Sequence, residues 1–199
     1  MNQDEVLRHF RETNALLEGH FLLSSGLHSS RYLQCAKVLM HPDRAALLCR
    51  ALADKVIAAV GEGGVDIVVA PAMGGVVVGY EMARQLGVPG MFTERVDGEF
   101  AFRRGFELEP GMRVLMAEDI VTTGKSSREC IEAINATGAR TVAASCLIDR
   151  SDGDVNFDDL GDVPLVSLTG LKVPSYEADA LPPELAALPA VKPGSRGLK

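Results

Sequence analysis

The chain has no tryptophan, and aromatic residues make up only 5% of its 199 residues. Its four cysteines are widely spaced and form no CxxC pair, which argues against a zinc site and against a disulfide framework. We therefore expect reduced cysteines and a cytoplasmic protein. The sequence also lacks a run of 18 apolar residues, so it predicts no membrane-spanning helix. Its polar, acidic N-terminus does not resemble a signal peptide.

The chain also has fewer basic than acidic residues. It contains 20 Lys and Arg and 27 Asp and Glu, which give a net charge of −7. This excess of acid argues against binding to a nucleic-acid backbone, so we expect no nucleic-acid and no membrane partner. An anionic substrate would need a local site rich in N–H donors or basic side chains. The length and the 47% apolar composition suit a single domain spanning residues 1–199.

Hydrophobic periodicity divides the chain into alternating strands and helices. Helical spacing is found at the N-terminus, with Asp4 near the expected cap, and over residues 42–60. Short strands and turns are expected over about 15–40, and a loop or hairpin over 96–111. Further strands are expected at 65–72, 88–95, 113–117, 141–150 and 163–171, with helices at 73–87 and 126–139 and an irregular tail at 180–199. This alternation predicts an α/β fold in which helices flank a parallel sheet.

Three loops follow the carboxyl ends of the expected parallel strands. They lie at residues 72–75, 118–126 and 149–150. Ligands of open α/β sheets bind beyond these strand ends, so we expect the three loops to converge on one crevice.

The second of these loops combines two acids with an anion-binding segment. In "EDIVTTGKSS" the stretch from Thr122 leads into a helix, whose N–H groups and dipole favour a phosphate. A polyphosphate-binding loop would need glycine at Asp119, and a carboxylate there would repel the phosphates. Two adjacent carboxylates suit hydroxyl donors or a metal. A ribose 5-phosphate, with its diol and its phosphate, meets both requirements.

The strand, the acid pair, the Thr-Thr-Gly loop and the helix together resemble the 5-phosphoribosyl-1-diphosphate (PRPP) motif of type I phosphoribosyltransferases. "EDIVTTGKS" is most similar to the version in orotate phosphoribosyltransferases. "LLEGHFLLSSGLHSSRYLQCAKVL" resembles the small hood segment of that family, "APAMGGVVVGYEMA" its pyrophosphate loop, and "LIDR" its base-site strand. "VKPGSR" near the end is similar to one bacterial branch. The fold implied is a type I phosphoribosyltransferase-like parallel sheet with a small N-terminal hood and a C-terminal tail.

The resemblance implies a Mg²⁺-dependent reaction of pyrimidine biosynthesis. Orotate and PRPP would give orotidine 5′-monophosphate and pyrophosphate, with Mg²⁺ held mainly by PRPP and water rather than by the protein. Glu118 and Asp119 would hold the ribose hydroxyls. The 5-phosphate would lie against Ile120, Val121, Thr122, Thr123, Gly124, Lys125 and Ser126. Thr122 and Arg150 would reach orotate, since a guanidinium can grip its carboxylate in a bidentate manner.

The chain departs from the family where lysines are usual. Many members have lysine at Ser24 and at Gly74, and lysines and a histidine in a mobile loop. The corresponding loop here offers Arg95, which we assign to PRPP, and Arg103 and Arg104, which join Glu118 and Asp119 as the candidate catalytic residues. In the family this loop crosses a two-fold interface, so the resemblance implies a homodimer.

Two alternatives remain open from the sequence. One is a phosphoribosyltransferase for a purine or for uracil, against which Thr122 and Arg150 argue. The other is a PRPP-sensing regulator, although no helix-turn-helix extension or basic patch is visible. No histidine has metal-ligand spacing, but His28 is a candidate ligand in the hood. Tyr32 and Leu33 are expected either to stack on the base or to form core.

Overall fold

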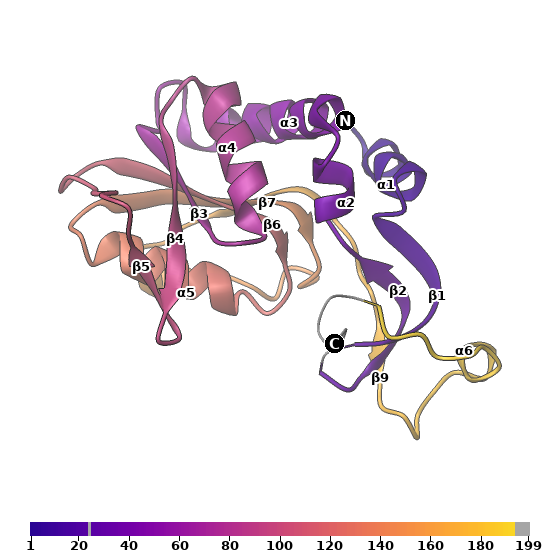
Figure 1. The fold of residues 1–199 in the computed structure, drawn as a ribbon. Helices are drawn as coiled ribbons and strands as arrows, with labels where there is room; N and C mark the ends of the chain where they lie inside the picture. Colours follow the sequence, from indigo (N-terminus) through magenta and orange to yellow (C-terminus); the bar gives the residue numbers. More distant parts are fainter. Residues whose placement is uncertain (24, 194–199) are drawn as a thin grey trace.

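The computed structural model describes residues 1–23 and 25–193, and it contains two β-sheets (Figure 1). The larger sheet has six strands in the order β5-β4-β3-β6-β7-β8, and the smaller has three in the order β1-β2-β9. The strands of the large sheet are β3 (Ile67–Pro71), β4 (Gly90–Val96), β5 (Glu99–Phe102), β6 (Arg113–Val121), β7 (Arg140–Asp149) and β8 (Leu165–Gly170). All neighbouring pairs in it are parallel except β4 and β5, which form an antiparallel hairpin. The predicted α/β fold with a mostly parallel sheet is confirmed.

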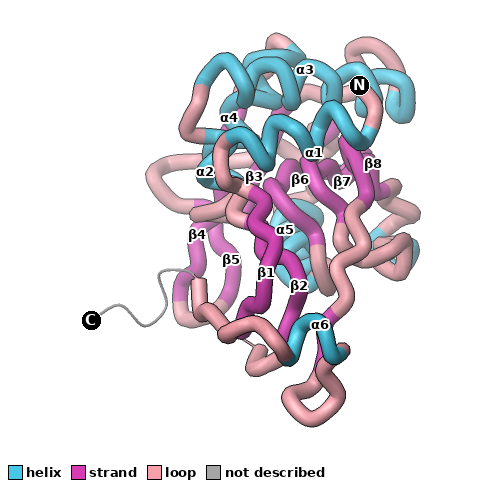
Figure 2. The backbone as a smooth tube through the Cα atoms, turned by 90° about the vertical axis from the view of Figure 1, so that its right-hand side faces the viewer, coloured by secondary structure: helices cyan, strands magenta, loops and turns pink. Residues whose placement is uncertain are grey.

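Helices cover both faces of the large sheet (Figure 2). On one face, α3 (Pro42–Val60) and α4 (Gly75–Leu86) pack with α1 (Gln3–Glu12) and α2 (Ala36–Leu39) around one hydrophobic core. On the other face, α5 (Lys125–Asn135) and the 3₁₀ turn η1 (Asp158–Leu160) bury a second core. Strands covered on both faces are apolar throughout, which is why β3 is buried at all five positions.

Local chemistry explains where two helices begin. Pro42 is at the first position of α3, where its missing N–H costs no hydrogen bond. Asn2 caps α1 by a capping box with Glu5, in which each side chain accepts from the other residue's backbone N–H. The cap is Asn2, two residues before Asp4, and Asp4 lies inside the first turn.

The helix α4 lies unusually close to strand β3. A Cβ atom built on Gly79 would be 2.5 Å from the Cβ of Ala70, so only glycine fits at this crossing. The close approach brings the loop that precedes α4 to the end of the neighbouring strand β6, where the acid pair lies.

The small sheet forms a hood from both ends of the described chain. Strands β1 (Leu16–Leu22) and β2 (His28–Leu33) form an antiparallel pair in the segment where short strands and turns were predicted, and β9 (Ser175–Tyr176) pairs antiparallel with β2. The short helix α6 (Pro183–Ala186) follows, and Val191 then pairs with Phe21 of β1. The prediction of an irregular tail over 180–199 is wrong at α6 and at Val191, and the hydrogen bonds of Val191 go to β1. Ser24 and residues 194–199 of "VKPGSRGLK" lie outside the described residues.

Candidate active site

The acid pair lies within strand β6 and not on a loop after it. The strand was predicted to end at residue 117, but its ladder with β7 continues through Glu118↔Cys146 to Val121↔Asp149. The strand extends because β7 offers backbone partners along this whole length. Glu118 and Asp119 are consequently fixed by backbone hydrogen bonds at the carboxyl edge of the sheet, where the sequence placed the crevice.

Glu118 is held by a residue from helix α5. The hydroxyl of Ser127, which is fully buried, donates a hydrogen bond to Oε2 of Glu118. Burial raises the pKa of the Glu118 carboxyl to about 7, and the neighbouring charge of Asp119 acts in the same direction. The Ser127 hydrogen bond and the positive charge of Arg95 oppose this rise. The effect of burial on this carboxyl therefore exceeds that of its hydrogen-bond and charge partners.

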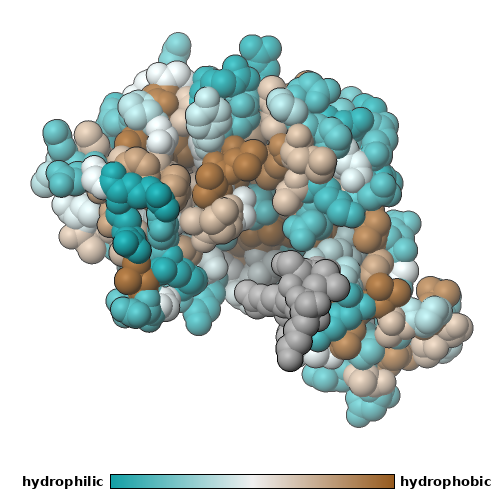
Figure 3. Space-filling model, viewed as in Figure 1, coloured by the Kyte–Doolittle hydropathy of each residue, from teal (hydrophilic) through white to brown (hydrophobic). Residues whose placement is uncertain are grey.

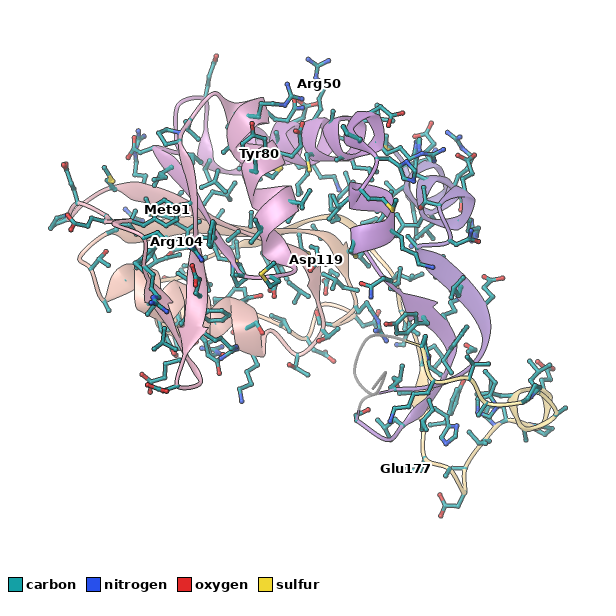
Figure 4. The ribbon with its side chains drawn as sticks, viewed as in Figure 1. Arg50, Tyr80, Met91, Arg104, Asp119 and Glu177 are labelled. Carbon is teal, nitrogen blue, oxygen red and sulfur yellow. The ribbon has the colours of Figure 1, made fainter. Side chains whose placement is uncertain are left out.

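Asp119 faces the loop that precedes α4. Its Oδ1 accepts from the Ile120 backbone N–H at 2.9 Å, and burial raises the pKa of the carboxyl. A Cβ atom on Gly74 would lie 3.1 Å from Asp119 Oδ1, so the predicted pyrophosphate loop and the acid are in near contact. Beneath them, the Cys35 thiol donates to the Asp119 carbonyl oxygen at 3.9 Å. Figure 4 shows Asp119 at the centre of the molecule, below α4.

The predicted phosphate loop leads from β6 into α5. Gly124 is the residue before the helix and has a φ of 71°, a backbone conformation that favours glycine. Val155 also packs closely against Gly124, since a Cβ atom at this position would be 2.7 Å from Val155 Cγ1. Thr122, Thr123 and Lys125 are exposed on the other side. The exposed hydroxyls and the N–H groups at the N-terminus of α5 are donors suited to an anion, next to the acid pair.

Arg150 lies beside this loop at the end of β7. Its backbone N–H donates to the Val121 carbonyl oxygen at 2.8 Å, which ties the two strand ends together. Its side-chain Nε is buried and has no hydrogen-bond partner among the described residues. Burial lowers the pKa of the guanidinium. A buried, unpaired guanidinium N–H is poised for an anionic or acceptor ligand, because leaving it unpaired is unfavourable.

The hairpin arginines engage carboxylates of the protein in this conformation. Arg95 bonds to Glu129 of α5 and stacks on Phe100 at 4.1 Å, and Arg104 bonds to Glu94. Arg103 is exposed. Asp97 and Gly98 form the hairpin turn with φ values of 52° and 94°, as a two-residue loop between twisted strands requires. The predicted hairpin is confirmed, and Figure 4 shows Arg104, which follows the end of β5, to one side of Asp119.

The hood residues fall into a separate group. His28, a candidate ligand, pairs through Nδ1 with Nε2 of His20 at 2.6 Å, and His20 Nδ1 bonds to the Leu188 carbonyl oxygen at 2.8 Å. Tyr32 packs against Phe21 with ring centres 5.9 Å apart. Of these contacts, the bond from His20 to Leu188 holds the C-terminal segment to the hood.

The structure thus brings together the acids, the phosphate loop, the glycine loop and Arg150, as the sequence predicted, but sequence reasoning missed Ser127 and Cys35. Both are buried small polar residues that are recognisable only by the acid each contacts. Within residues 1–23 and 25–193, no group of three or more His, Cys, Asp or Glu side chains is placed to hold a metal ion. The same residues include no helix long and apolar enough to cross a bilayer.

Comparison with known proteins adds sequence and structural relatives. The phosphoribosyl transferase domain model matches residues 38–160. The chain is 59% identical to the orotate phosphoribosyltransferase of Maricaulis maris (strain MCS10), and the match covers 100% of both chains. It is 58% identical to that of Caulobacter vibrioides (strain NA1000 / CB15N), again over 100% of both. The crystal structure of orotate phosphoribosyltransferase from Aeropyrum pernix superposes with a TM-score of 0.69 at 25% identity, covering 83% of this chain and 93% of that one.

Proposed function

Because the chain belongs to the phosphoribosyltransferase family, and to its orotate phosphoribosyltransferase branch, we propose that its site works as follows. The enzyme transfers the 5-phosphoribosyl group of PRPP to orotate and yields orotidine 5′-monophosphate and pyrophosphate. The observation that carries the assignment of the site is the convergence of Glu118, Asp119, the N-terminus of α5 and Arg150 at the ends of β6 and β7.

The acid pair receives the ribose diol of PRPP. Two carboxylates whose charge is disfavoured by burial gain most from hydroxyl donors, since each hydrogen bond replaces lost solvation. The phosphate lies against the N–H groups and hydroxyls of residues 120–126, which supply donors without requiring a basic side chain. With both ends of the sugar phosphate fixed, the anomeric carbon points toward the loop that contains Gly74.

The chemistry then needs positioning and charge stabilisation. Departure of pyrophosphate leaves an oxocarbenium-like ribosyl centre, and the nearby Asp119 carboxylate stabilises its positive charge. No covalent nucleophile is required. Arg103 and Arg104, together with Arg95, meet the pyrophosphate once the hairpin closes. Arg95 and Arg104 then exchange their present carboxylate contacts for the phosphates.

Mg²⁺ fits this arrangement as a partner of the substrate. The donor set consists of carboxylates and of substrate hydroxyl and phosphate oxygens, which are the ligands Mg²⁺ prefers, and one or two protein carboxylates suffice when a substrate completes the shell. When bound, Mg²⁺ would neutralise charge on the leaving pyrophosphate. The protein residues nearest to the bound Mg²⁺ would be Glu118 and Asp119.

Arg150 and Thr122 select the base. The unpaired Nε of Arg150 matches the carboxylate that distinguishes orotate from uracil and from purines. Thr122 is exposed on the adjoining loop and offers its hydroxyl. A site built to hydrogen-bond a charged group rejects bases that lack it, because the guanidinium would then remain unpaired.

We further propose that the enzyme is a homodimer. Val77 and Tyr80 on α4, and Met73 just before its N-cap, are spaced by four and three residues, and Met73, Val77 and Tyr80 are 82%, 48% and 72% exposed. Figure 3 shows hydrophobic residues gathered over this part of α4, next to the hairpin. A second copy covering this stripe would bring a neighbouring hairpin toward the site. Four free, buried cysteines support a reducing, cytoplasmic compartment.

The reaction is tested by incubating the protein with PRPP, Mg²⁺ and one base at a time. Orotate should give orotidine 5′-monophosphate, whereas adenine, hypoxanthine, guanine and uracil should give far less nucleotide. Asp119→Asn should lower kcat/KM by about tenfold to a hundredfold or more, since a charge-assisted hydrogen bond is worth roughly 1.5–3 kcal/mol. Turnover of another base would overturn the assignment. PRPP binding without turnover of any base would favour a regulator.

A further inference from the structure

We propose that Ser127 is a positioning residue for this reaction, whose hydroxyl holds the Glu118 carboxylate in the orientation that receives the ribose hydroxyls. The inference rests on the proposed function, which assigns Glu118 to the ribose. It adds a residue outside the predicted set of 118–126, and one that does not itself touch PRPP.

The geometry ties together the two ends of the PRPP loop. Glu118 is in strand β6 and Ser127 is in the first turn of α5, nine residues further along the chain. Their hydrogen bond closes the intervening loop, which carries every other candidate contact to the sugar phosphate. The bond engages Oε2 of Glu118 and leaves its second oxygen for a ligand. A carboxylate free to rotate would lose this orientation.

The groups that surround Glu118 supply little positive charge to it. Asp119 on the same strand, Cys130 on α5 and Cys146 on β7 bring no positive charge to Glu118. Arg95 of β4 is the cation that reaches it electrostatically, and Arg95 is already bonded to Glu129. Ser127 is therefore the direct hydrogen-bond donor to the Glu118 side chain, and its removal takes away the contact that orients this carboxylate.

A purely structural role for Ser127 makes a different prediction. Ser145 of β7 is a matched case, because it is also fully buried and its hydroxyl donates to the Met116 carbonyl oxygen at 3.3 Å. Removing that hydroxyl affects stability alone. Ser145→Ala is thus the control for loss of a buried hydroxyl that meets no catalytic group.

The test compares kcat, the KM for PRPP and the KM for orotate in wild type, Ser127→Ala, Ser127→Thr and Ser145→Ala. Ser127→Ala should lose about tenfold in kcat/KM for PRPP, the scale of one charge-assisted hydrogen bond. The KM for orotate should stay unchanged. Ser127→Thr, which keeps the hydroxyl, should restore most of the activity, and Ser145→Ala should keep the wild-type kinetic constants. Ser127→Cys, of similar size but a weak donor, should fall between and serves if Ser127→Ala does not fold.

A double-mutant cycle distinguishes the role of Ser127 from the assignment of Glu118 to the ribose, on which it rests. If Ser127 acts through Glu118, then Glu118→Gln/Ser127→Ala should be no worse than Glu118→Gln alone. Additive losses, or a Ser127→Ala protein with the wild-type kcat/KM for PRPP, would overturn the role of Ser127 while leaving the reaction intact. Wild-type kinetics in Glu118→Gln would instead overturn the assignment of Glu118 to the ribose, and the inference with it.

Discussion

At the scale of single residues, Glu118 is placed where its charge opposes folding. In the folded chain burial raises the pKa of its carboxyl from 4.5 to about 7. Between these values the folded state binds more protons than the unfolded state, so this site makes the free energy of unfolding fall as pH rises. The contribution of the Glu118 carboxyl to the free energy of unfolding is fully present below pH 4.5, and it is lost as the pH rises through about 7.

Glu118→Gln should therefore stabilise the protein at pH 8 while impairing catalysis. The gain should reach up to about 3 kcal/mol, since each pKa unit corresponds to about 1.4 kcal/mol. Urea unfolding at pH 5 and at pH 8 measures the effect, with the exposed Glu109→Gln as a control. Equal stability of the variant and the wild type at pH 8 would mean that water or a cation compensates the buried charge.

Arg150→Ala should affect the binding of the two substrates differently. We expect the orotate KM to rise at least about tenfold, as the loss of a charge-assisted pair implies, with PRPP affinity nearly unchanged. Initial rates with each substrate varied in turn give both values, and Arg140→Ala at the exposed start of β7 is the control. A loss of PRPP affinity with unchanged orotate binding would place Arg150 elsewhere.

Residues of this site differ in how far sequence reveals them. Residues 118–126 are contiguous, so their types and order alone indicated the chemistry. Ser127 and Cys35 could not be found in this way, because each acts through a partner on another element. The pairing of Arg95 with Glu129 and of Arg104 with Glu94 was equally invisible, since sequence does not show which carboxylate a surface arginine meets.

At the scale of elements, the crossing of α4 over β3 sets the position of the glycine loop. Gly79→Ala would force a methyl group to within 2.5 Å of the Ala70 Cβ, so the helix must shift. We expect a loss of about 1–3 kcal/mol in unfolding free energy, as overpacking of a core usually costs. Ala70→Gly/Gly79→Ala should recover part of this loss in urea unfolding, because it removes the opposing methyl group. A double variant less stable than Gly79→Ala would contradict the steric explanation.

Element boundaries followed from the sequence only where the cause is local. The strands and helices of the large sheet were anticipated because their apolar spacing is a property of each segment. The true end of β6 and the pairing of β9 and Val191 depend on strands that are distant in sequence. The proline-rich composition of residues 180–199 indicated irregular structure, but Val191 forms hydrogen bonds with β1.

At the scale of the whole molecule, the proposed dimer predicts complementation between two defective proteins. Arg103→Ala/Arg104→Ala would lack the hairpin arginines, and Asp119→Ala/Thr122→Ala would lack the PRPP site. If the hairpin acts on the neighbouring subunit, mixed dimers regain one intact site. Activity should then rise after subunit exchange toward roughly a quarter of wild type, because half of the dimers are mixed and each has one working site.

The exposed stripe on α4 provides the control for this experiment. Tyr80→Asp introduced into both proteins should yield monomers in sedimentation velocity and abolish the recovery. If exchange is demonstrated and no activity returns, the hairpin serves its own subunit or these arginines are not catalytic. An Arg103→Ala/Arg104→Ala protein that is active by itself would establish the second explanation.

The hood joins β1 and β2 to residues 175–191, and this has a consequence for the order of folding. During synthesis every strand of the large sheet precedes β9, so that sheet can form while the hood still has only two strands. Contacts between segments so far apart in sequence close slowly, because a long loop must first be ordered. A growing chain would then acquire its sugar-phosphate loop before its hood is complete, and base binding should mature last.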